Sequence, residues 1–224
     1  GMVILVGKDM SDITVDGNTI IAMAGATLGS VSQTAAKNSL GGMEFASGIP
    51  GTIGGAIVMN AGAYDGEMKM IVEEVRVLTQ DGEILTLSNE ELEFGYRTSR
   101  VKKEKLIVLS VKLLLQPQKQ ELIYEKMNDF AARRREKQPL EFPSAGSTFK
   151  RPEGMFAGKL IMDAGLRGYS VGGAQVSEKH CGFVINKGNA TAKEIHKLIY
   201  DVQEKVKASS GVTLEPEVIF IGDF

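Results

Sequence analysis

Residues 47–62, S-G-I-P-G-T-I-G-G-A-I-V-M-N-A-G, set the first hypothesis about the fold, because five of the sixteen positions are glycine and none is charged. Glycines at this density let a backbone run close to a ligand and direct its N–H groups at phosphate or ring oxygens. The spacing is not that of a Walker motif, since Ala56 and Ile57 stand where Gly-Lys-Ser/Thr is needed, and it is not G-x-G-x-x-G. The alternative is a buried glycine-rich turn that packs a helix onto a sheet.

Apolar residues within this segment favour a flat aromatic ligand over a bare phosphate; they are Ile49, Ile53, Ile57 and Val58. We therefore predict a loop that approaches a cofactor. The residues expected to contact the cofactor are Ser47, Gly48, Ile49, Pro50, Gly51, Thr52, Gly54, Gly55, Asn60, Gly62 and, from a later loop, Tyr96.

Length and composition are those of an ordinary globular protein. The chain has 224 residues, enough for one large domain or two small ones, and 43% of them are hydrophobic. A formal net charge of -2 offers no electrostatic footprint for nucleic acid or an anionic membrane, and no apolar run approaches the ~20 residues that span a bilayer. Two histidines and one cysteine are too few for a zinc site or an intramolecular disulfide. We expect no metal, no nucleic-acid or membrane partner, and a cytoplasmic monomer or weak oligomer.

Turn signals and apolar periodicity predict an α+β protein of two subdomains. Asp16-Gly17 and Asp81-Gly82 each favour a hairpin turn, Thr27 is expected to cap a helix, and Thr191 with Glu194 forms a capping box before another helix. The predicted strands are 3–6, 13–15, 18–24, 72–79, 83–87, 107–115, 169–171, 182–185 and 217–221. The predicted helices are 28–38, 121–137, 159–163 and 191–208.

A polar stretch that contains a proline, residues 116–120, separates the two parts. The strand before it is an almost unbroken apolar run and is expected to be buried on both faces. The helix after it carries an apolar stripe of Leu122, Ile123, Met127, Phe130 and Ala131. We divide the chain into residues 1–118, a linker helix over 119–138, and a second domain over 139–224.

Two further loops contain residues suited to chemistry. Arg97 follows Tyr96 in F-G-Y-R-T-S-R, where it is either a surface arginine or a guanidinium that pairs with a carboxylate through two parallel bonds. The loop 143–152, P-S-A-G-S-T-F-K-R-P, is either a tight connection or a site whose Lys150 and Arg151 hold an anion. No G-x-S-x-G elbow is present, so a serine in this loop is better suited to donating a proton or hydrogen bond than to nucleophilic attack.

Several other residues have ordinary structural interpretations beside functional ones. The run Arg133-Arg134-Arg135 with Lys137 is either a solvated helix end, favoured by the helix dipole, or part of a diphosphate site. Glu217 begins an apolar strand, either at its surface or drawn partly inward. Cys181 is expected to be a small buried residue, and His196 to lie on the rim of its helix.

Eight segments, taken in order, resemble the UDP-N-acetylenolpyruvoylglucosamine reductase (MurB) family of peptidoglycan synthesis. They are G-I-P-G-T-I-G-G, N-A-G-A-Y, G-Y-R-T-S-R, R-R-E-K-Q-P, A-G-S-T-F-K-R-P, G-G-A-Q-V-S, G-F-V-I-N and L-E-P-E-V. Each is weak alone, but their order and spacing make coincidence remote. The resemblance implies a FAD-binding domain of the vanillyl-alcohol-oxidase/PCMH type, of which this chain would hold the second subdomain, and a C-terminal α+β domain for the UDP-sugar.

The resemblance also implies a reaction. NADPH would reduce the flavin, which would pass hydride to C3 of the enolpyruvyl ether in UDP-N-acetylglucosamine-enolpyruvate, giving UDP-N-acetylmuramate. By motif, Arg97 and Glu217 would stabilise the enolate that forms at C2, and Ser147 would deliver the proton to that carbon. Charge moves onto the substrate carboxylate, so preorganised donors there stabilise the transition state more than the ground state. The candidates for binding the UDP-sugar diphosphate are Lys137, Arg151, Arg167 and His180.

Two departures from the family pattern qualify this hypothesis. The short interval between Arg97 and Ser147 indicates a subgroup without an inserted substrate-capping loop, and the family's G-x-G-S-N pyrophosphate loop is not found in these 224 residues. We therefore expect a truncated chain that binds FAD weakly. Two other hypotheses stay open: an alcohol oxidase of the same fold, disfavoured by the pairing of Ser147 with Glu217, and a non-catalytic module that binds a nucleotide sugar.

Overall fold

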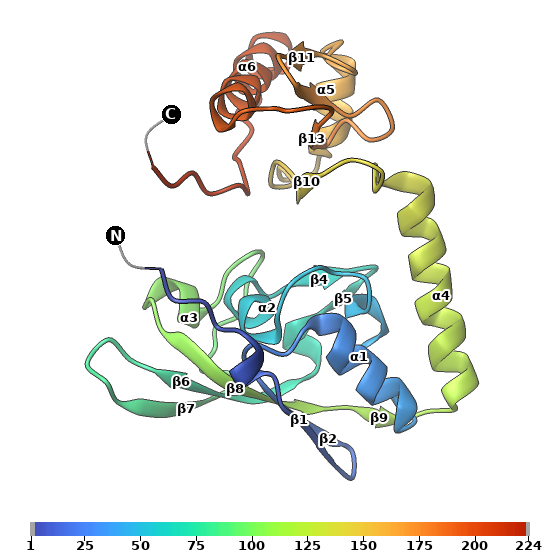
Figure 1. The fold of residues 1–224 in the computed structure, drawn as a ribbon, viewed down its shortest axis with the longest axis vertical. Helices are drawn as coiled ribbons and strands as arrows, with labels where there is room; N and C mark the ends of the chain where they lie inside the picture. Colours follow the sequence, from blue (N-terminus) through green and yellow to red (C-terminus); the bar gives the residue numbers. More distant parts are fainter. Residues whose placement is uncertain (1–2, 223–224) are drawn as a thin grey trace. The chain divides into compact units, whose positions relative to one another are not determined.

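The computed structural model describes residues 3–222, which separate into two compact units with the division between Arg133 and Arg134. The first unit is built on a five-stranded antiparallel sheet with the order β1-β2-β8-β6-β7 (Figure 1). Its strands are β1 (Ile13–Asp16), β2 (Thr19–Met23), β6 (Val72–Leu78), β7 (Ile84–Ser88) and β8 (Ile107–Leu114). Both predicted hairpins are confirmed, and Gly17 and Gly82 adopt the positive φ that their turns need.

Two helices, α1 (Leu28–Lys37) and α2 (Ile53–Met59), cover one face of this sheet (Figure 1). The predicted cap of α1 is confirmed, since Thr27 Oγ1 accepts a hydrogen bond from the Ser30 N–H at 3.1 Å. Fully buried side chains from both layers form the core, and each of its valine, leucine and isoleucine side chains contributes about 1.5–3 kcal/mol by its burial. They include Ile20, Ala22, Leu28, Val31, Ile53, Ile57, Val75, Val77, Val111 and Leu113.

Strand β8 lies in the middle of the sheet, between β2 and β6, yet it is not buried on both faces as predicted. Val111 and Leu113 are fully buried, whereas Ile107 and Leu114 at its two ends are 46% and 49% exposed. The prediction was wrong at these ends because an unbroken apolar run does not tell how many faces of a strand other elements cover.

Shorter elements complete the first unit. They are η1 (Lys8–Met10), β3 (Leu40–Gly41), η2 (Glu44–Ala46), β4 (Gly62–Ala63), β5 (Gly66–Glu67), η3 (Met68–Met70), α3 (Arg100–Lys103) and β9 (Gln116–Pro117). The predicted strand over residues 3–6 is not formed, and Val3 and Leu5 are about nine-tenths exposed, at 93% and 89%. An apolar run without a neighbouring strand has no partner for its backbone hydrogen bonds.

Helix α4 (Gln120–Lys137) confirms the helix predicted over residues 121–137. Ile123, Met127 and Phe130 are buried as predicted, but Leu122 is 48% exposed and does not belong to the stripe. The Phe130 ring stacks on Tyr64 with a centroid distance of 4.4 Å, and the Tyr64 hydroxyl donates to the Phe130 carbonyl at 3.2 Å. These contacts attach the larger part of α4 to the first unit.

The second unit contains a four-stranded sheet with the order β10-β13-β12-β11, packed against two helices (Figure 1). Its elements are β10 (Ser144–Ser147), α5 (Ala157–Asp163), β11 (Ser170–Val171), β12 (Ala174–Val176), β13 (Phe183–Asn186) and α6 (Ala192–Ser210). The capping box of Thr191 and Glu194 is confirmed. Cys181 is buried as predicted, and burial raises the pKa of its thiol.

The predicted strand over 217–221 is wrong. The chain pairs with Thr148–Lys150 only as far as Glu217, whose N–H donates to the Thr148 carbonyl at 2.9 Å. Beyond this point Ile219 and Ile221 are 74% and 86% exposed. A continuous apolar run, 218–221, indicated a strand here, but the sequence of this segment does not tell whether another strand pairs with it.

Candidate active site

The sequence predicted a loop over the whole glycine-rich segment 47–62. Only its first part is a loop, because helix α2 begins at Ile53. Thr52 is the N-cap of α2, and its Oγ1 accepts a weak hydrogen bond from the Gly55 N–H at 3.4 Å. Asn60 ends α2 in a left-handed conformation with φ of 42°. Pattern reading missed α2 because two of its seven residues, Gly54 and Gly55, have low helix propensity.

The glycines of this segment fall into two groups. Gly54 and Gly62 are packing positions: a Cβ on Gly54 would lie 3.0 Å from the Ala24 carbonyl oxygen, and one on Gly62 would lie 2.7 Å from that of Gly66. Gly48, Gly51 and Gly55 are exposed, and Gly51 has φ of 131° with no atom within 4 Å of a Cβ position. Only the second group therefore offers backbone that a ligand could approach.

Two predicted features of this segment are corrected by its packing. Ile53 and Ile57 are fully buried in the core and cannot face a ligand. The Ile53 and Gly54 N–H groups donate to the carbonyls of Ala26 and Ala24, at 2.8 and 3.0 Å. The packing hypothesis thus holds for the helical half of the segment. Among the other residues expected at the cofactor, Pro50 is exposed, while Ser47, Ile49 and Thr52 are half-buried.

Glu44, just before this segment, is a buried carboxylate that sequence reasoning missed. It is 2% exposed, accepts the Gly42 N–H at 2.9 Å through Oε2, and has Lys126 Nζ 3.9 Å from the same oxygen. Its Oε1 is buried without a hydrogen-bond partner in the described part of the chain. The available signal was a lone acidic residue within the otherwise uncharged run 38–62.

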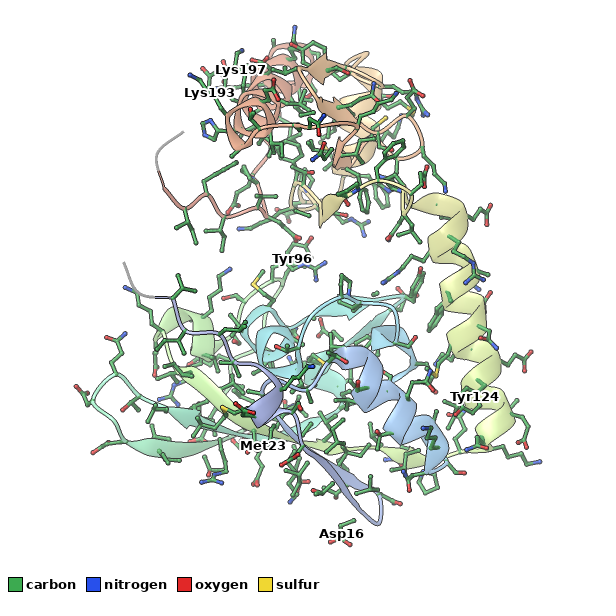
Figure 2. All side chains as sticks on the ribbon, viewed as in Figure 1. Asp16, Met23, Tyr96, Tyr124, Lys193 and Lys197 are labelled. Carbon is green, nitrogen blue, oxygen red and sulfur yellow. The ribbon has the colours of Figure 1, made fainter. Side chains whose placement is uncertain are left out.

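Tyr96 and Arg97 form the tip of a tight turn between Gly95 and Thr98. The turn is closed by two main-chain hydrogen bonds, Gly95 N–H to Thr98 O at 3.1 Å and Thr98 N–H to Gly95 O at 3.3 Å. The Tyr96 side chain projects from the surface of the first unit and is 57% exposed (Figure 2). Arg97 is half-buried, has φ of 54°, and holds its guanidinium carbon 5.2 Å from the Tyr96 ring centroid.

In the second unit the structure brings the backbones of Ser147 and Glu217 together. Ser147 is exposed at the end of β10, where it pairs with Phe183 of β13. The next residue, Thr148, donates its N–H to the Gly182 carbonyl at 2.8 Å and accepts the Glu217 N–H at 2.9 Å. Main-chain bonds on both sides of residue 148 thus place two predicted catalytic residues in one region, with Glu217 half-buried.

The basic residues predicted to bind substrate lie at several places in the second unit. Lys137 is exposed in the last turn of α4. Arg151 is exposed, with its guanidinium carbon 4.0 Å from the Phe156 ring centroid and its Nε donating to the Met155 carbonyl at 3.3 Å. Arg167 donates to the Glu178 carbonyl. Arg167 therefore lies beside the chain that leads to His180.

His180, one of the residues predicted to bind substrate, carries no positive charge at neutral pH. Burial lowers the pKa of its imidazole, so the ring is neutral at pH 7. Nδ1 accepts the Gly182 N–H at 3.0 Å, and the ring meets Phe183 edge-on at a centroid distance of 5.0 Å. In this tautomer the remaining proton is on Nε2, so His180 can donate one neutral hydrogen bond.

The described residues 3–222 include no group of three metal-binding side chains and no helix long and apolar enough to cross a membrane. Arg133 forms an ion pair with Asp129 one turn earlier, at 2.7 Å. This contact agrees with the solvated-helix-end interpretation of the basic run. His196 is exposed on α6, as predicted, and meets Phe220 edge-on at 4.6 Å.

Comparison with known proteins identifies the class to which this fold and site belong. Residues 1–88 match the FAD binding domain family, and residues 138–221 match the family described as UDP-N-acetylenolpyruvoylglucosamine reductase, C-terminal domain. The protein is thus a flavin-dependent oxidoreductase with an α+β FAD-binding part and an α+β C-terminal domain.

Individual relatives identify the family. UDP-N-acetylenolpyruvoylglucosamine reductase from Agathobacter rectalis is 56% identical, with all of this chain and 75% of that protein aligned. The enzymes of the same name from Clostridium botulinum and Syntrophomonas wolfei are 54% and 52% identical, aligned over 71% and 75% of their lengths. The crystal structure of UDP-N-acetylenolpyruvylglucosamine reductase from Thermus caldophilus matches with a TM-score of 0.79 and 40% identity, covering 88% of this chain and 70% of that one. The chain belongs to the UDP-N-acetylenolpyruvoylglucosamine reductase family.

Proposed function

We propose that Arg97, Ser147 and Glu217 each act in the reaction by which this protein reduces UDP-N-acetylglucosamine-enolpyruvate to UDP-N-acetylmuramate, with FAD as cofactor and NADPH as reductant. The observation that carries this proposal is the main-chain pairing around Thr148, which joins the neighbourhoods of Ser147 and Glu217 although they are far apart in the sequence. A serine hydroxyl and a carboxyl group in one region supply the two functions, proton delivery and charge stabilisation, that the reaction requires.

The first unit has features that fit a flavin. Gly48, Gly51 and Gly55 expose backbone, and the space beside Gly51 is open where any side chain would begin. We propose that this exposed backbone, with Ser47, Ile49, Pro50, Thr52 and the Tyr96 ring, holds FAD. When bound, the flavin supplies hydride to the substrate. Asn60, Gly54 and Gly62 are buried or packed against other backbone, so we propose that they support these contacts rather than make them.

Hydride addition at C3 moves negative charge onto the substrate carboxylate. The Arg97 guanidinium can bind that carboxylate through two parallel N–H···O hydrogen bonds. These hydrogen bonds become stronger as negative charge develops on the carboxylate. Glu217 can also donate to the carboxylate, but only while it carries its proton, because two carboxylates would otherwise repel. Both groups therefore favour the enolate form of the substrate over its ground state.

The reaction is completed by a proton at C2. Ser147 is exposed, and its hydroxyl can give a proton to this carbon. The transfer is favourable only if enough negative charge stays on C2 to make that carbon more basic than the serine alkoxide that forms. The C2–H bond forms as the Ser147 O–H bond breaks, and the alkoxide regains a proton from solvent. The product gains one hydrogen as hydride and one as a proton.

The substrate diphosphate needs cationic or N–H donors. We propose that Lys137, Arg151 and Arg167 supply charge and that neutral His180 supplies one directional hydrogen bond. We also propose a cytoplasmic monomer or weak oligomer, since NADPH and nucleotide sugars are cytoplasmic metabolites and the single cysteine is a buried free thiol.

An isotope experiment tests the function. The intact natural polypeptide is given FAD, NADPH and UDP-N-acetylglucosamine-enolpyruvate in D2O, and the product is analysed by mass spectrometry and proton NMR. We expect deuterium at C2 in the product, because a serine O–H exchanges with solvent; C3 receives hydrogen from the reduced flavin, either protium from NADPH or deuterium after exchange with solvent. No turnover would refute the function, and protium at C2 would refute delivery of a solvent-exchangeable proton to that carbon.

A further inference from the structure

The turn that carries Arg97 has a backbone conformation that its own sequence disfavours. Arg97 is the third residue of the turn Gly95–Thr98 and has φ of 54°. A turn with positive φ at this position ordinarily has glycine or asparagine there. Because arginine carries a Cβ, the surroundings of the turn must hold it in this state.

Asn60 supplies such a restraint from outside the turn. Its side chain is 2% exposed, and Nδ2 donates both to the Gly95 carbonyl at 3.2 Å and to Glu67 Oε2 at 3.1 Å. Oδ1 accepts the Lys69 N–H at 3.0 Å. Both amide hydrogens and the carbonyl are therefore bonded within the first unit, so the side chain is fixed in one orientation.

Two more hydrogen bonds join the same part of α2 to the segment that carries Arg97. Ser99, which is fully buried, donates from Oγ to the Val58 carbonyl at 3.1 Å. Lys102 Nζ contacts Met59 Sδ at 3.6 Å and donates to the Arg97 carbonyl at 3.2 Å. The last residues of α2 thus hold the turn from both sides.

We infer that Asn60 is a positioning residue, whose carboxamide holds the Gly95 carbonyl and through it the left-handed turn that presents Arg97. The inference rests on the role proposed for Arg97. It joins the glycine-rich segment to the arginine, because the helix that begins in that segment ends at Asn60. Its physical basis is a buried, fully bonded amide that links the end of α2 to the Gly95 carbonyl.

The main variant is Asn60→Gly. Glycine tolerates the left-handed conformation at the end of α2 without strain, so this substitution removes the side-chain bonds and spares the backbone. The matched control is Asn89→Ala, because Asn89 also donates two hydrogen bonds from Nδ2, to the Lys69 and Val72 carbonyls, without contacting the turn. If Asn60→Gly does not fold, Asn60→Asp combined with Glu67→Gln replaces it. That pair keeps side-chain volume and one hydrogen bond between positions 60 and 67, and removes the side-chain hydrogen bond to the Gly95 carbonyl.

Two measurements are made on each variant: amide hydrogen exchange at Gly95 and Thr98, and kcat and KM in the proposed reaction. We expect exchange at both amides to accelerate about tenfold in Asn60→Gly, as for the loss of one buried hydrogen bond, and not in Asn89→Ala. We expect kcat to fall by about tenfold or more with a smaller change in KM for NADPH, because only the substrate carboxylate meets Arg97.

Hydrogen exchange does not depend on activity, so the inference and the proposed function can fail separately. Unchanged exchange at Gly95 and Thr98 would overturn the inference even if the enzyme were active. Faster exchange with unchanged kcat would also overturn it, since the turn would then not need to be held. An inactive wild type would instead refute the proposed function, while the exchange rates would still decide whether Asn60 holds the turn.

Discussion

The Arg97 turn and the Ser147–Glu217 region place their site residues by different means. In the first unit, the Asn60 and Ser99 side chains hold the turn to the end of α2, and Gly54 brings the helix against the Ala24 backbone. In the second unit, main-chain bonds do the same work, with Thr148 bonded to Gly182 on one side and to Glu217 on the other.

This difference predicts where substitutions act. Main-chain hydrogen bonds do not depend on side-chain identity, so most substitutions in the Ser147–Glu217 region should leave its geometry intact and affect only the chemistry of the residue replaced. The Arg97 turn depends on particular side chains and on a glycine. Substitutions of residues that contact neither FAD nor the UDP-sugar should therefore reduce activity or stability in the first unit.

Within the first unit, the largest effect is expected at Arg97 itself. Arg97→Lys keeps the charge but cannot form two parallel hydrogen bonds with a carboxylate, so we expect kcat/KM for the UDP-sugar to fall by about 10²–10³-fold. The control is Arg100→Ala on the neighbouring helix, whose Nε pairs with exposed Glu104 at 2.7 Å. The kcat/KM of Arg100→Ala should differ from that of the wild type by no more than about twofold, since exposed ion pairs contribute little. Equal activity of Arg97→Lys and wild type would remove Arg97 from the reaction site.

A smaller effect, on stability, is expected from adjacent glycines of α2. Gly54→Ala places a Cβ 3.0 Å from Ala24 atoms and should lower the free energy of unfolding by about 1–3 kcal/mol, as overpacking does. Gly55→Ala meets only Thr52 Oγ1 at 3.7 Å and should raise it by up to about 1 kcal/mol, because alanine favours the helix. Urea denaturation measures both. Similar gains in the two variants would show that helix propensity, not close packing, decides the stability of this segment, and similar losses would contradict the open surroundings of Gly55.

Much of the fold could be predicted because it follows from local signals. Asp-Gly turns fixed both hairpins, and Thr27 and Thr191 fixed the starts of two helices. Errors arose where the burial of a residue or the pairing of a strand depends on residues far away in the sequence. The ends of β8 and the residues after Glu217 are apolar enough for buried strands, but nothing in their own sequence tells what covers or pairs with them.

The sequence predicted the residue types proposed for the site, but not the buried residues that lie beneath them. The segments G-Y-R-T-S-R and A-G-S-T-F-K-R-P gave the Arg97 and Ser147 hypotheses, which stay proposals. Glu44 and Ser99 were missed because their burial is a property of the folded unit. The substrate-binding role predicted for His180 stays a proposal, and the lowered pKa of its ring has no local sequence signal because it comes from burial in the folded unit.

The most direct test of the account separates the two half-reactions by stopped-flow absorbance. The flavin is first reduced with NADPH, and its reoxidation by UDP-N-acetylglucosamine-enolpyruvate is then followed in wild type, Ser147→Ala and the control Ser144→Ala, which changes another exposed serine of β10. We expect all three proteins to be reduced at similar rates, and substrate-dependent reoxidation with product formation to fall by about 10²–10⁴-fold in Ser147→Ala alone. Reoxidation of Ser147→Ala at the wild-type rate would contradict the assignment of Ser147 as the proton donor.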